Sequence, residues 1–488
     1  MLRSSSALLL GLGRSILAPF QKSTRMVTVI PPAPEAIVPS PNPTQSYWLR
    51  ELSPFADTRT TPILPEAADV VIIGAGITGV SALYHLTQSA PHLRVALVDA
   101  RGVAEGATGR NAGMATPLAS VGFRARAESL GSVKAALDSV AFERKCVREL
   151  TATIDALGLR DRVQLRSGGV LNLAESPAEW EGMLADLEFY RKHTVRLADN
   201  DMEEIRVLDP AQLEKEFSTT PGGFYGGIFS SLGFQMWPFR LSVGLVQHCL
   251  STNGANVNMQ MRTVVTGISR TPTTENASSY TVHTDRGPIR TTHVVHATNA
   301  YVSHLVPSLQ GSVVPVRGQM VAGKLAHDRA RPTWTTGLAF NDGLEYLQQR
   351  DDGTLLLGGG REFATGAPAM EIGEWRDDAV NPLISAGLEH TFRDRFVHGP
   401  GLEVAQAWTG IMGFATTGQP IVGRLVGAEA GVVSNQWVAV GYTGHGMPRC
   451  FLAAKNLVLQ ILGREDEVDA AIHSCFKVPS DAIEPLST

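Results

Sequence analysis

The chain has 488 residues, of which 43% are hydrophobic and 18% charged, and its formal net charge is −5. This length and composition predict a globular protein with a large core, divided into two closely connected domains. The negative charge, without basic clusters in the globular part, argues against nucleic acid as a partner. No apolar run reaches the roughly 18 residues of a membrane-spanning helix, so we expect no membrane span.

The four cysteines lie far apart and form no C-x-x-C motif. Neither they nor the histidines show compact ligand spacing, so we predict no metal site. Scattered cysteines of this kind suit a reducing compartment.

Residues 1–34 differ in composition from the rest of the chain. They contain arginines, a lysine and several serines, and no acidic residue precedes Glu35. This pattern is typical of a mitochondrial transit peptide, but Met26 could equally start the chain. Mitochondrial and cytoplasmic locations therefore both stay open. Residues 35–65 follow as a Pro-rich linker and N-terminal arm.

The stretch 69–113 contains the most informative motif. An apolar run at 70–73, a glycine turn, a helix at 80–89 and a second apolar run at 95–98 follow one another. Gly74 permits the tight turn, Gly76 removes a side chain from the path of a pyrophosphate, and Gly79 permits close packing of helix and strand. The phosphates would lie on the unpaired N–H groups of the helix N-terminus.

Asp99 closes the second apolar run at 99 − 79 = 20 positions after the last glycine. An acid at that distance would accept hydrogen bonds from ribose hydroxyls. Together these features predict an adenine-dinucleotide site rather than a structural glycine turn.

A second loop of small residues, 106–113, includes Arg110 and Asn111. With the preceding fingerprint it resembles the FAD-dependent amine and amino-acid oxidoreductases, the superfamily of D-amino-acid oxidase, glycine oxidase and sarcosine oxidase. The nearest resemblance is to the gamma-glutamylputrescine-oxidase-like branch and its fungal relatives. It implies that the loop passes beside the flavin, with Arg110 and Asn111 near the isoalloxazine.

Hydrophobic periodicity and end signals predict the remaining elements. Helices are expected at 133–158, 177–191, 243–250 and 371 to about 392. Strands are expected at 163–174 (two short ones), 264–269, 280–284, 289–297, 315–320, 344–349 and 354–358.

The resemblance covers the chain from about Trp48 to Gly463. It implies an α/β fold, in which a discontinuous Rossmann-type FAD-binding domain is interleaved with an α+β substrate domain on a mostly antiparallel sheet. The FAD-binding parts would be 66–160, 235–311 and 405–470. The substrate parts would be 161–234 and 312–404, and 471–488 would form a C-terminal tail.

Near the C-terminus, residues 408–414, 418–423 and 438–447 resemble the last cofactor segment of this family. A final glycine turn would lead into a helix from about Met447 to Leu462. Its N–H groups could stabilise negative charge at the N1–C2=O edge of the reduced flavin. His445, between two glycines, is assigned to flavin contact and not to proton transfer.

The resemblance implies two sets of site residues, while no catalytic residue is assigned because the flavin carries the chemistry. Cofactor-binding residues are Gly74, Ala75, Gly76, Ile77, Thr78, Gly79, Asp99, Ala100, Arg101, Thr108, Gly109, Arg110, Asn111, Ala112, Gly113, Val265, Ala297, Thr298, Gly444, His445, Gly446 and Met447. Substrate-pocket candidates are Arg317, Tyr346, Trp408 and Met412. Arg317 could instead be a sheet-edge or inter-domain partner, and Tyr346 and Trp408 could be core residues.

Several positions depart from the family pattern. Glycine oxidases hold the substrate carboxylate with an arginine near the position of Met412, and methionine cannot form such an ion pair. An amine, polyamine or secondary amine is therefore favoured over a simple α-amino acid. The covalent flavin attachment points of some relatives would fall near Gly410 and Arg110. Neither is Cys or His, so we expect non-covalent FAD.

The implied reaction is hydride transfer from the α-carbon of an amine to flavin N5, followed by hydrolysis of the imine. Reoxidation by O2 would give hydrogen peroxide, and a mitochondrial acceptor such as a quinone or electron-transfer flavoprotein is the alternative. Two other classes stay open. One is an NAD(P)-dependent dehydrogenase, and the other is a catalytically weak flavoprotein acting as a regulatory partner, suggested by Ala112, Met114 and Thr417.

Overall fold

The computed structural model describes residues 38–51, 54–55, 57–194, 203–271, 279–326, 333–365, 369–429 and 433–485. The hypothesis of a transit peptide at 1–34 lies outside the described residues. Within the described ranges, no helix is long and apolar enough to cross a membrane.

The first sheet is centred on β1 (Ala67–Ile73). Its parallel neighbours are β2 (Val95–Val98) and β12 (Gly287–His296). Val70 and Ile72 of β1 face one hydrophobic core, and Val71 and Ile73 face another. A parallel strand buried on both faces reads as a continuous apolar run, which is why 70–73 was recognisable from the sequence. The other strands of this sheet are β9 (Val257–Gln260), β10 (Val265–Thr271), β11 (Ser279–Thr284), β18 (Ile421–Arg424) and β19 (Gln436–Val440).

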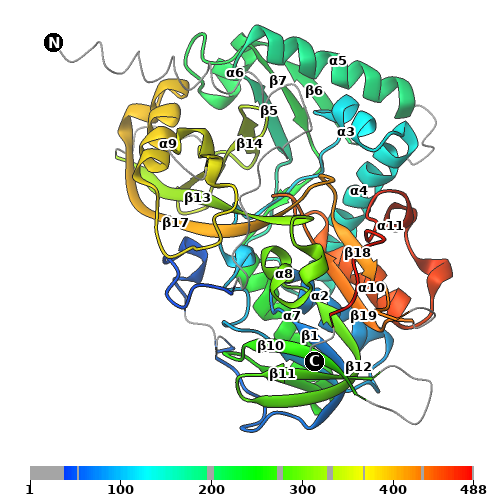
Figure 1. Ribbon diagram of the computed structural model, residues 1–488. Helices are drawn as coiled ribbons and strands as arrows, with labels where there is room; N and C mark the ends of the chain where they lie inside the picture. The colour runs from blue at the N-terminus through cyan, green and yellow to red at the C-terminus, as the bar shows by residue number, and fades with distance from the viewer. Residues whose placement is uncertain are drawn as a thin grey trace.

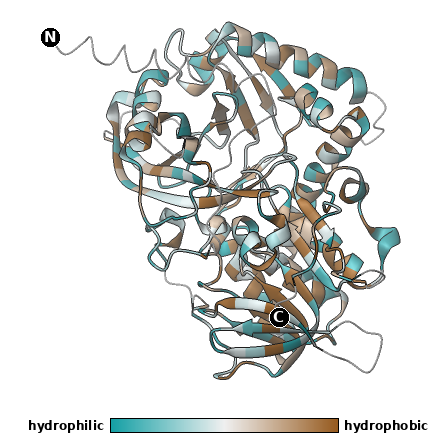
Figure 2. Ribbon diagram, in the orientation of Figure 1, coloured by the Kyte–Doolittle hydropathy of each residue, from teal (hydrophilic) through white to brown (hydrophobic). Residues whose placement is uncertain are grey.

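Helices cover both faces of this sheet (Figure 1). One core contains side chains of α2 (Ile77–Ser89), α7 (Pro238–Asn253) and α10 (Cys450–Ile461). The short α8 (Val302–Leu305) packs on the other face. Figure 2 shows the hydrophobic strands gathered at the centre of this layer. The arrangement is the predicted Rossmann-type half of the fold.

The second sheet has eight strands in the order β17-β13-β16-β15-β14-β5-β7-β6. All its pairs are antiparallel except β14 with β5, so the predicted mostly antiparallel substrate sheet is confirmed. The strands are β5 (Val170–Ala174), β6 (Ile205–Leu208), β7 (Gly226–Ser230), β13 (Val313–Leu325), β14 (Gly337–Phe340), β15 (Glu345–Gln349), β16 (Leu355–Gly358) and β17 (Leu402–Ala415). The predicted boundary at 404/405 falls inside β17, because that strand is paired with β13 along its whole length.

The remaining elements connect or cover the two sheets. A small third sheet has the order β3 (Met114–Ala115), β8 (Phe234–Gln235) and β4 (Arg166–Ser167). The other α-helices are α3 (Phe123–Ser129), α4 (Val133–Ala156), α5 (Pro177–Thr194), α6 (Pro210–Phe217), α9 (Pro382–Arg395) and α11 (Ala470–Ser474).

Four helix predictions are wrong at their starts, and two of these helices begin earlier than expected: α2 at Ile77 rather than residue 80, and α7 at Pro238 rather than residue 243. The helix expected from residue 371 begins only at Pro382, with Asn381 as its N-cap. Glu371 has φ +61°, a left-handed conformation that interrupts a helix. The final helix begins at Cys450 rather than Met447. Met447 precedes Pro448, and proline disfavours helical backbone in the residue before it.

Candidate cofactor and substrate site

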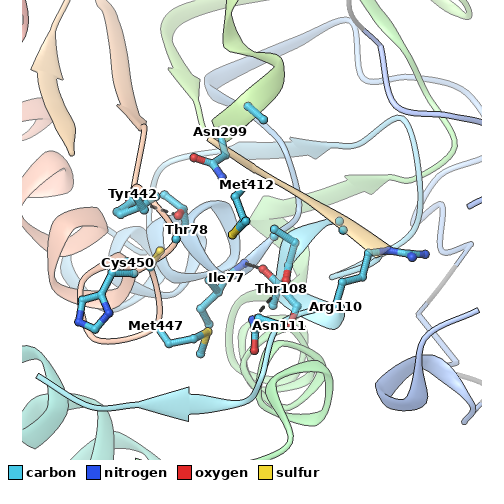
Figure 3. A pocket seen from close by; sticks show the side chains of 18 of the residues that line it. Ile77, Thr78, Thr108, Arg110, Asn111, Asn299, Met412, Tyr442, Met447 and Cys450 are labelled. Atoms are coloured by element: carbon cyan, nitrogen blue, oxygen red, sulfur yellow. Dashed lines mark hydrogen bonds between the residues drawn. The ribbon is translucent and has the colours of Figure 1, made fainter. Parts of the chain in front are cut away.

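One continuous cavity lies at the carboxyl ends of β1, β2 and β12 and extends to the second sheet. Ligands of open α/β sheets bind at this edge. Figure 3 shows side chains from the start of α2, from the loop at 106–113, from β17 of the second sheet and from the loop before α10 around it.

The glycine turn after β1 is packed as the sequence predicts. A Cβ atom on Gly79 would lie 1.8 Å from the carbonyl oxygen of Gly74, so only glycine lets α2 pack this closely on β1. Gly74 has φ +108° and faces the carbonyl oxygen of Ala297. A Cβ on Gly76 would have only Thr108 Oγ1 nearby, at 3.2 Å, so this glycine leaves the N-terminus of α2 open to the cavity. These features fit the pyrophosphate of a dinucleotide.

Thr108 links the second glycine-rich loop to this helix. Its Oγ1 accepts a hydrogen bond from the Ile77 backbone N–H at 2.9 Å, as the dashed line in Figure 3 shows. A hydroxyl at the N-terminus of α2 satisfies one of the donors that a helix leaves unpaired. The loop is therefore held where the phosphates would lie.

Asp99 lies at the carboxyl end of β2 and lines the cavity. Its two oxygens accept backbone hydrogen bonds from Ala75 at 2.5 Å and Arg101 at 2.6 Å. Burial raises the pKa of this carboxyl, while the two N–H donors act in the opposite direction. A carboxylate has about four acceptor sites, so acceptor capacity remains for the ribose hydroxyls.

The arginines of this region bind protein groups. Arg110 donates to the carbonyl oxygens of Glu105, Thr44 and Thr409 at 2.8, 2.8 and 2.9 Å. Its guanidinium points away from the other labelled side chains in Figure 3. Burial lowers the pKa of Arg110 to about 10, although Asp377 partly offsets this. The guanidinium therefore holds three protein segments together. Arg110 lines the cavity with its other atoms and not with its charge.

Asn111 also serves its own loop. Its Oδ1 accepts a hydrogen bond from the Gly113 N–H at 2.6 Å, and its Nδ2 donates to the carbonyl oxygens of Ala107 and Thr108. These bonds fix the shape of the segment that the resemblance places beside the flavin.

The N-terminal arm closes one side of the cavity, where Val38 and Pro39 belong to the lining. The Ser40 carbonyl oxygen accepts a hydrogen bond from Arg101 at 2.7 Å. Trp48 Nε1 donates to the Asn111 carbonyl oxygen at 2.6 Å. Sequence reasoning treated 35–65 as a linker and missed this role, because a Pro-rich composition gives no signal for what the segment contacts.

The loop before α10 faces the glycine turn. Tyr442 and Thr78 hydroxyls lie 3.3 Å apart, and Asn299 Oδ1 accepts a hydrogen bond from the Gly441 N–H at 3.0 Å (Figure 3). Sequence analysis placed Tyr442 in the last cofactor segment, 438–447, but neither Asn299 nor Tyr442 was among the individual site residues. Asn299 has φ +47°, a conformation for which asparagine is enriched, so its position after β12 was a usable signal.

The structure brings most of the predicted site residues to the cavity. Those that line it are Gly74, Gly76, Ile77, Thr78, Asp99, Ala100, Arg101, Thr108, Arg110, Asn111, Ala112, Val265, Ala297, Thr298, Tyr346, Met412, Gly444, His445, Gly446 and Met447. Those outside the lining are Ala75, Gly79, Gly109, Gly113, Arg317 and Trp408.

Two substrate-pocket candidates thus have other contacts. Arg317 forms an ion pair with Glu371 at 2.5 Å. Trp408 is fully buried, and its Nε1 donates to the Arg110 carbonyl oxygen at 2.9 Å. Trp408 therefore supports the loop at 106–113 from behind.

The end of the cavity nearest the second sheet is uncharged. It is lined by side chains of β5, β7 and β14, and by β3 and the loop that follows it. The members are Met114, Thr116, Pro117, Leu118, Ala119, Ser120, Val121, Val170, Asn172, Ile228, Ser230 and Ala339. Sequence reasoning missed this surface, because alternating residues in a strand do not show which face meets a ligand.

Comparisons with known proteins agree with this geometry. Residues 69–459 match the family described as DAO, FAD dependent oxidoreductase. The chain is 25% identical over 440 residues to gamma-glutamylputrescine oxidoreductase of Escherichia coli K12, covering 88% of this chain and 91% of the relative.

Solved structures with similar folds include glycine oxidase from Bacillus cereus, with a TM-score of 0.64 and 16% identity, covering 84% of this chain and 99% of that one. L-proline dehydrogenase from P. horikoshii has a TM-score of 0.64 and 18% identity, with coverage of 85% and 100%. These two likenesses concern the fold alone. Because the family match spans most of the chain, the protein belongs to the DAO family of FAD-dependent oxidoreductases.

Proposed function

We propose that this protein oxidises the C–N bond of an amine, with FAD held non-covalently in the cavity described above. The observation that carries the proposal is the continuity of that cavity, from the glycine turn and Asp99 to the uncharged surface of the second sheet. Bound FAD would accept the hydride, and the protein would supply binding and orientation. Membership of an FAD family removes the NAD(P)-dependent alternative.

Each part of the cavity has a role in this proposal. The open N-terminus of α2 at Gly76 would hold the pyrophosphate, and the Asp99 carboxylate would accept hydrogen bonds from the ribose hydroxyls. The turn at 441–446 would place N–H groups at the pyrimidine edge of the ring and favour its reduction. Gly410 packs directly against the side chain of Arg110, and neither residue can bond covalently to a flavin.

The cavity lining favours an amine whose substituents carry no charge other than that of the reacting nitrogen. Met412 lies in the cavity where glycine oxidases are expected to carry an arginine, and the side chains of the second-sheet end are neutral. An α-carboxylate or a second ammonium group would lose its hydration there without gaining an opposite charge. We therefore narrow the earlier expectation, which included polyamines, to amines without a second charge.

Three finer assignments remain predictions. They are placement in the gamma-glutamylputrescine-oxidase-like fungal branch, reoxidation by O2 rather than by a mitochondrial acceptor, and a cytoplasmic or mitochondrial location. The relatives are named for activities on gamma-glutamylputrescine, glycine and proline, which differ from one another, so they support the reaction class more than a substrate.

The test is an absorption spectrum of the purified protein, repeated without oxygen after adding benzylamine, N-methylbenzylamine, putrescine, glycine or proline. We expect a flavin spectrum, release of the flavin into solution by acid, and bleaching by the benzylamines before the compounds that carry a second charge. Protein that fails to take up FAD would overturn the proposal. Bound FAD that none of the amines or amino acids reduces would favour the regulatory-flavoprotein alternative, and peroxide formation on admitting air would identify O2 as acceptor.

A further inference from the structure

A buried carboxylate lies behind His445. Glu143 of α4 is fully buried, and its Oε2 lies 3.4 Å from His445 Nε2. The same carboxylate accepts hydrogen bonds from Arg449 Nε at 2.8 Å and from the Leu118 N–H at 2.6 Å. Both His445 and Leu118 line the cavity. Glu143 therefore joins the loop before α10 to the loop at the uncharged end.

The imidazole has a buried side and a cavity side. Nε2 is buried and faces Glu143, whereas 20% of the side chain is exposed in a residue that lines the cavity. Among the described residues, neither ring nitrogen makes a hydrogen bond, and the Glu143 carboxylate acts on Nε2 through its charge at 3.4 Å. A carboxylate beside Nε2 favours the tautomer that carries its hydrogen there, which leaves the lone pair on Nδ1 available.

The charges around the ring decide its protonation state. Glu143 from α4, Arg126 from α3 and Arg449 from the turn before α10 face it, and Tyr442 and Cys450 pack beside the neighbouring Gly446. Burial lowers the pKa of His445, Glu143 acts against this, and the two guanidiniums add to the lowering. Burial alone would raise the pKa of Glu143, but the Arg449 guanidinium overcomes it, and with Arg126 it holds that pKa far below its usual range. A neutral ring beside an ionised carboxylate is the arrangement of a general base.

Amine oxidation needs such a base near neutral pH. An alkylamine has a pKa of about 10, so it arrives mainly as an ammonium ion, whose nitrogen has no lone pair to assist departure of a hydride. We propose that Nδ1 of His445 removes a proton from the substrate ammonium and that Glu143 positions the ring. This inference rests on the proposed function. The N–H bond breaks, its electron pair stays on the amine nitrogen, and the proton forms a bond to Nδ1 and later passes to water. This revises the assignment of His445 to flavin contact alone.

The first test is the pH dependence of flavin reduction by benzylamine in His445→Gln holoenzyme. Glutamine cannot take up the proton, so we expect a loss of about 10²–10⁴-fold at neutral pH. The rate of the variant should rise about tenfold per pH unit and approach that of the unsubstituted protein near pH 10, where about half of the amine is neutral. A structural defect would not be repaired in this way. His390→Gln is the matched control, because this exposed histidine pairs with Asp394 on the surface.

The second test does not depend on activity. In ¹⁵N-histidine NMR spectra, the signals of His445 are identified by their loss in His445→Gln. We expect their chemical shifts to show that Nε2 carries the hydrogen and Nδ1 does not. Glu143→Gln should abolish this preference and lower the pKa of the ring. Glu143→Asp keeps a charge for Arg449 if the amide variant does not fold. Glu149→Gln, also on α4 and paired with Lys455 at 2.8 Å, should change neither property.

The outcomes separate the two proposals. If no amine reduces the flavin of the unsubstituted protein, the proposed function and the base both fall. If reduction proceeds and His445→Gln has an unchanged pH profile, or if Nδ1 carries the hydrogen, only the assignment of the base falls.

Discussion

Arg101 and Asp377 form a buried bidentate ion pair, with Nη1 and Nη2 of the arginine 2.8 and 2.7 Å from the two carboxylate oxygens. Arg101 follows β2 of the first sheet, and Asp377 lies in the loop before α9, which packs on the second sheet. The pair therefore ties the ribose end of the cavity to the other half of the molecule.

Asp377→Asn should be strongly destabilising, because it leaves the Arg101 guanidinium buried without its counter-charge. The expected loss is about 3–5 kcal/mol of the free energy of unfolding. Urea denaturation measures it. Glu374→Gln is the control, since its partner Arg376 is 56% exposed and such pairs contribute at most about 1 kcal/mol. Equal losses in both variants would show that burial of the pair is unimportant.

Gly79→Ala should prevent formation of the cofactor site. The added Cβ would meet the Gly74 carbonyl oxygen at 1.8 Å, so α2 would have to move away from β1. We expect loss of bound FAD, measured by absorbance of the purified protein. Gly182→Ala in α5 meets no atom within 4 Å and should instead raise the free energy of unfolding by about 0.5–1 kcal/mol.

Thr108→Val should weaken FAD binding without unfolding the protein. Valine has nearly the same shape but no oxygen to accept the Ile77 N–H, so it leaves that donor unpaired and loosens the loop. A lost hydrogen bond of this kind costs about 1–3 kcal/mol, or roughly 5- to 150-fold in the dissociation constant. Titration of apoprotein with FAD, followed by flavin fluorescence, gives the constant. Unchanged affinity with unchanged stability would remove Thr108 from the cofactor site.

The buried Glu345 should make stability depend on pH. Burial and the neighbouring Glu362 raise the pKa of its carboxyl above the ordinary value of 4.5. The folded protein therefore keeps a proton that the unfolded chain loses, and the free energy of unfolding should fall as pH rises from about 4.5 toward the raised value. Glu345→Gln mimics the protonated carboxyl and should be more stable, relative to the unsubstituted protein, at pH 8 than at pH 5. Glu389→Gln, whose side chain is 32% exposed, should show no such difference.

The first cofactor motif could be predicted from sequence because its geometry is local. The positive φ of Gly74 and the close packing of Gly79 on the Gly74 carbonyl group belong to a short stretch of chain, and both require glycine. The second sheet was predicted as mostly antiparallel through the resemblance and the strand pattern. The order of its eight strands was not predicted, because an alternating apolar and polar pattern does not specify which strand pairs with which.

The partners of the site residues could not be predicted, because they are distant in the chain. Asp377 lies 276 positions from Arg101, and Glu143 and His445 are on different elements. Arg110 shows the same limit, since its residue type suggested a ligand contact, whereas its guanidinium binds carbonyl oxygens of the arm and β17. Local sequence patterns therefore predict backbone conformation more readily than they predict which group a long side chain contacts.

The pairing of β13 with β17 has a consequence for how the cavity opens. The pair extends from Val313 and Ala415, in a core of the first sheet, to Leu325 and Leu402, in the core of the second. A hinge rotation between the halves would have to break this ladder. Substrate entry and product escape are therefore expected to follow the motion of loops such as 116–122, on the microsecond-to-millisecond timescale, so the rate of turnover would be sensitive to solvent viscosity.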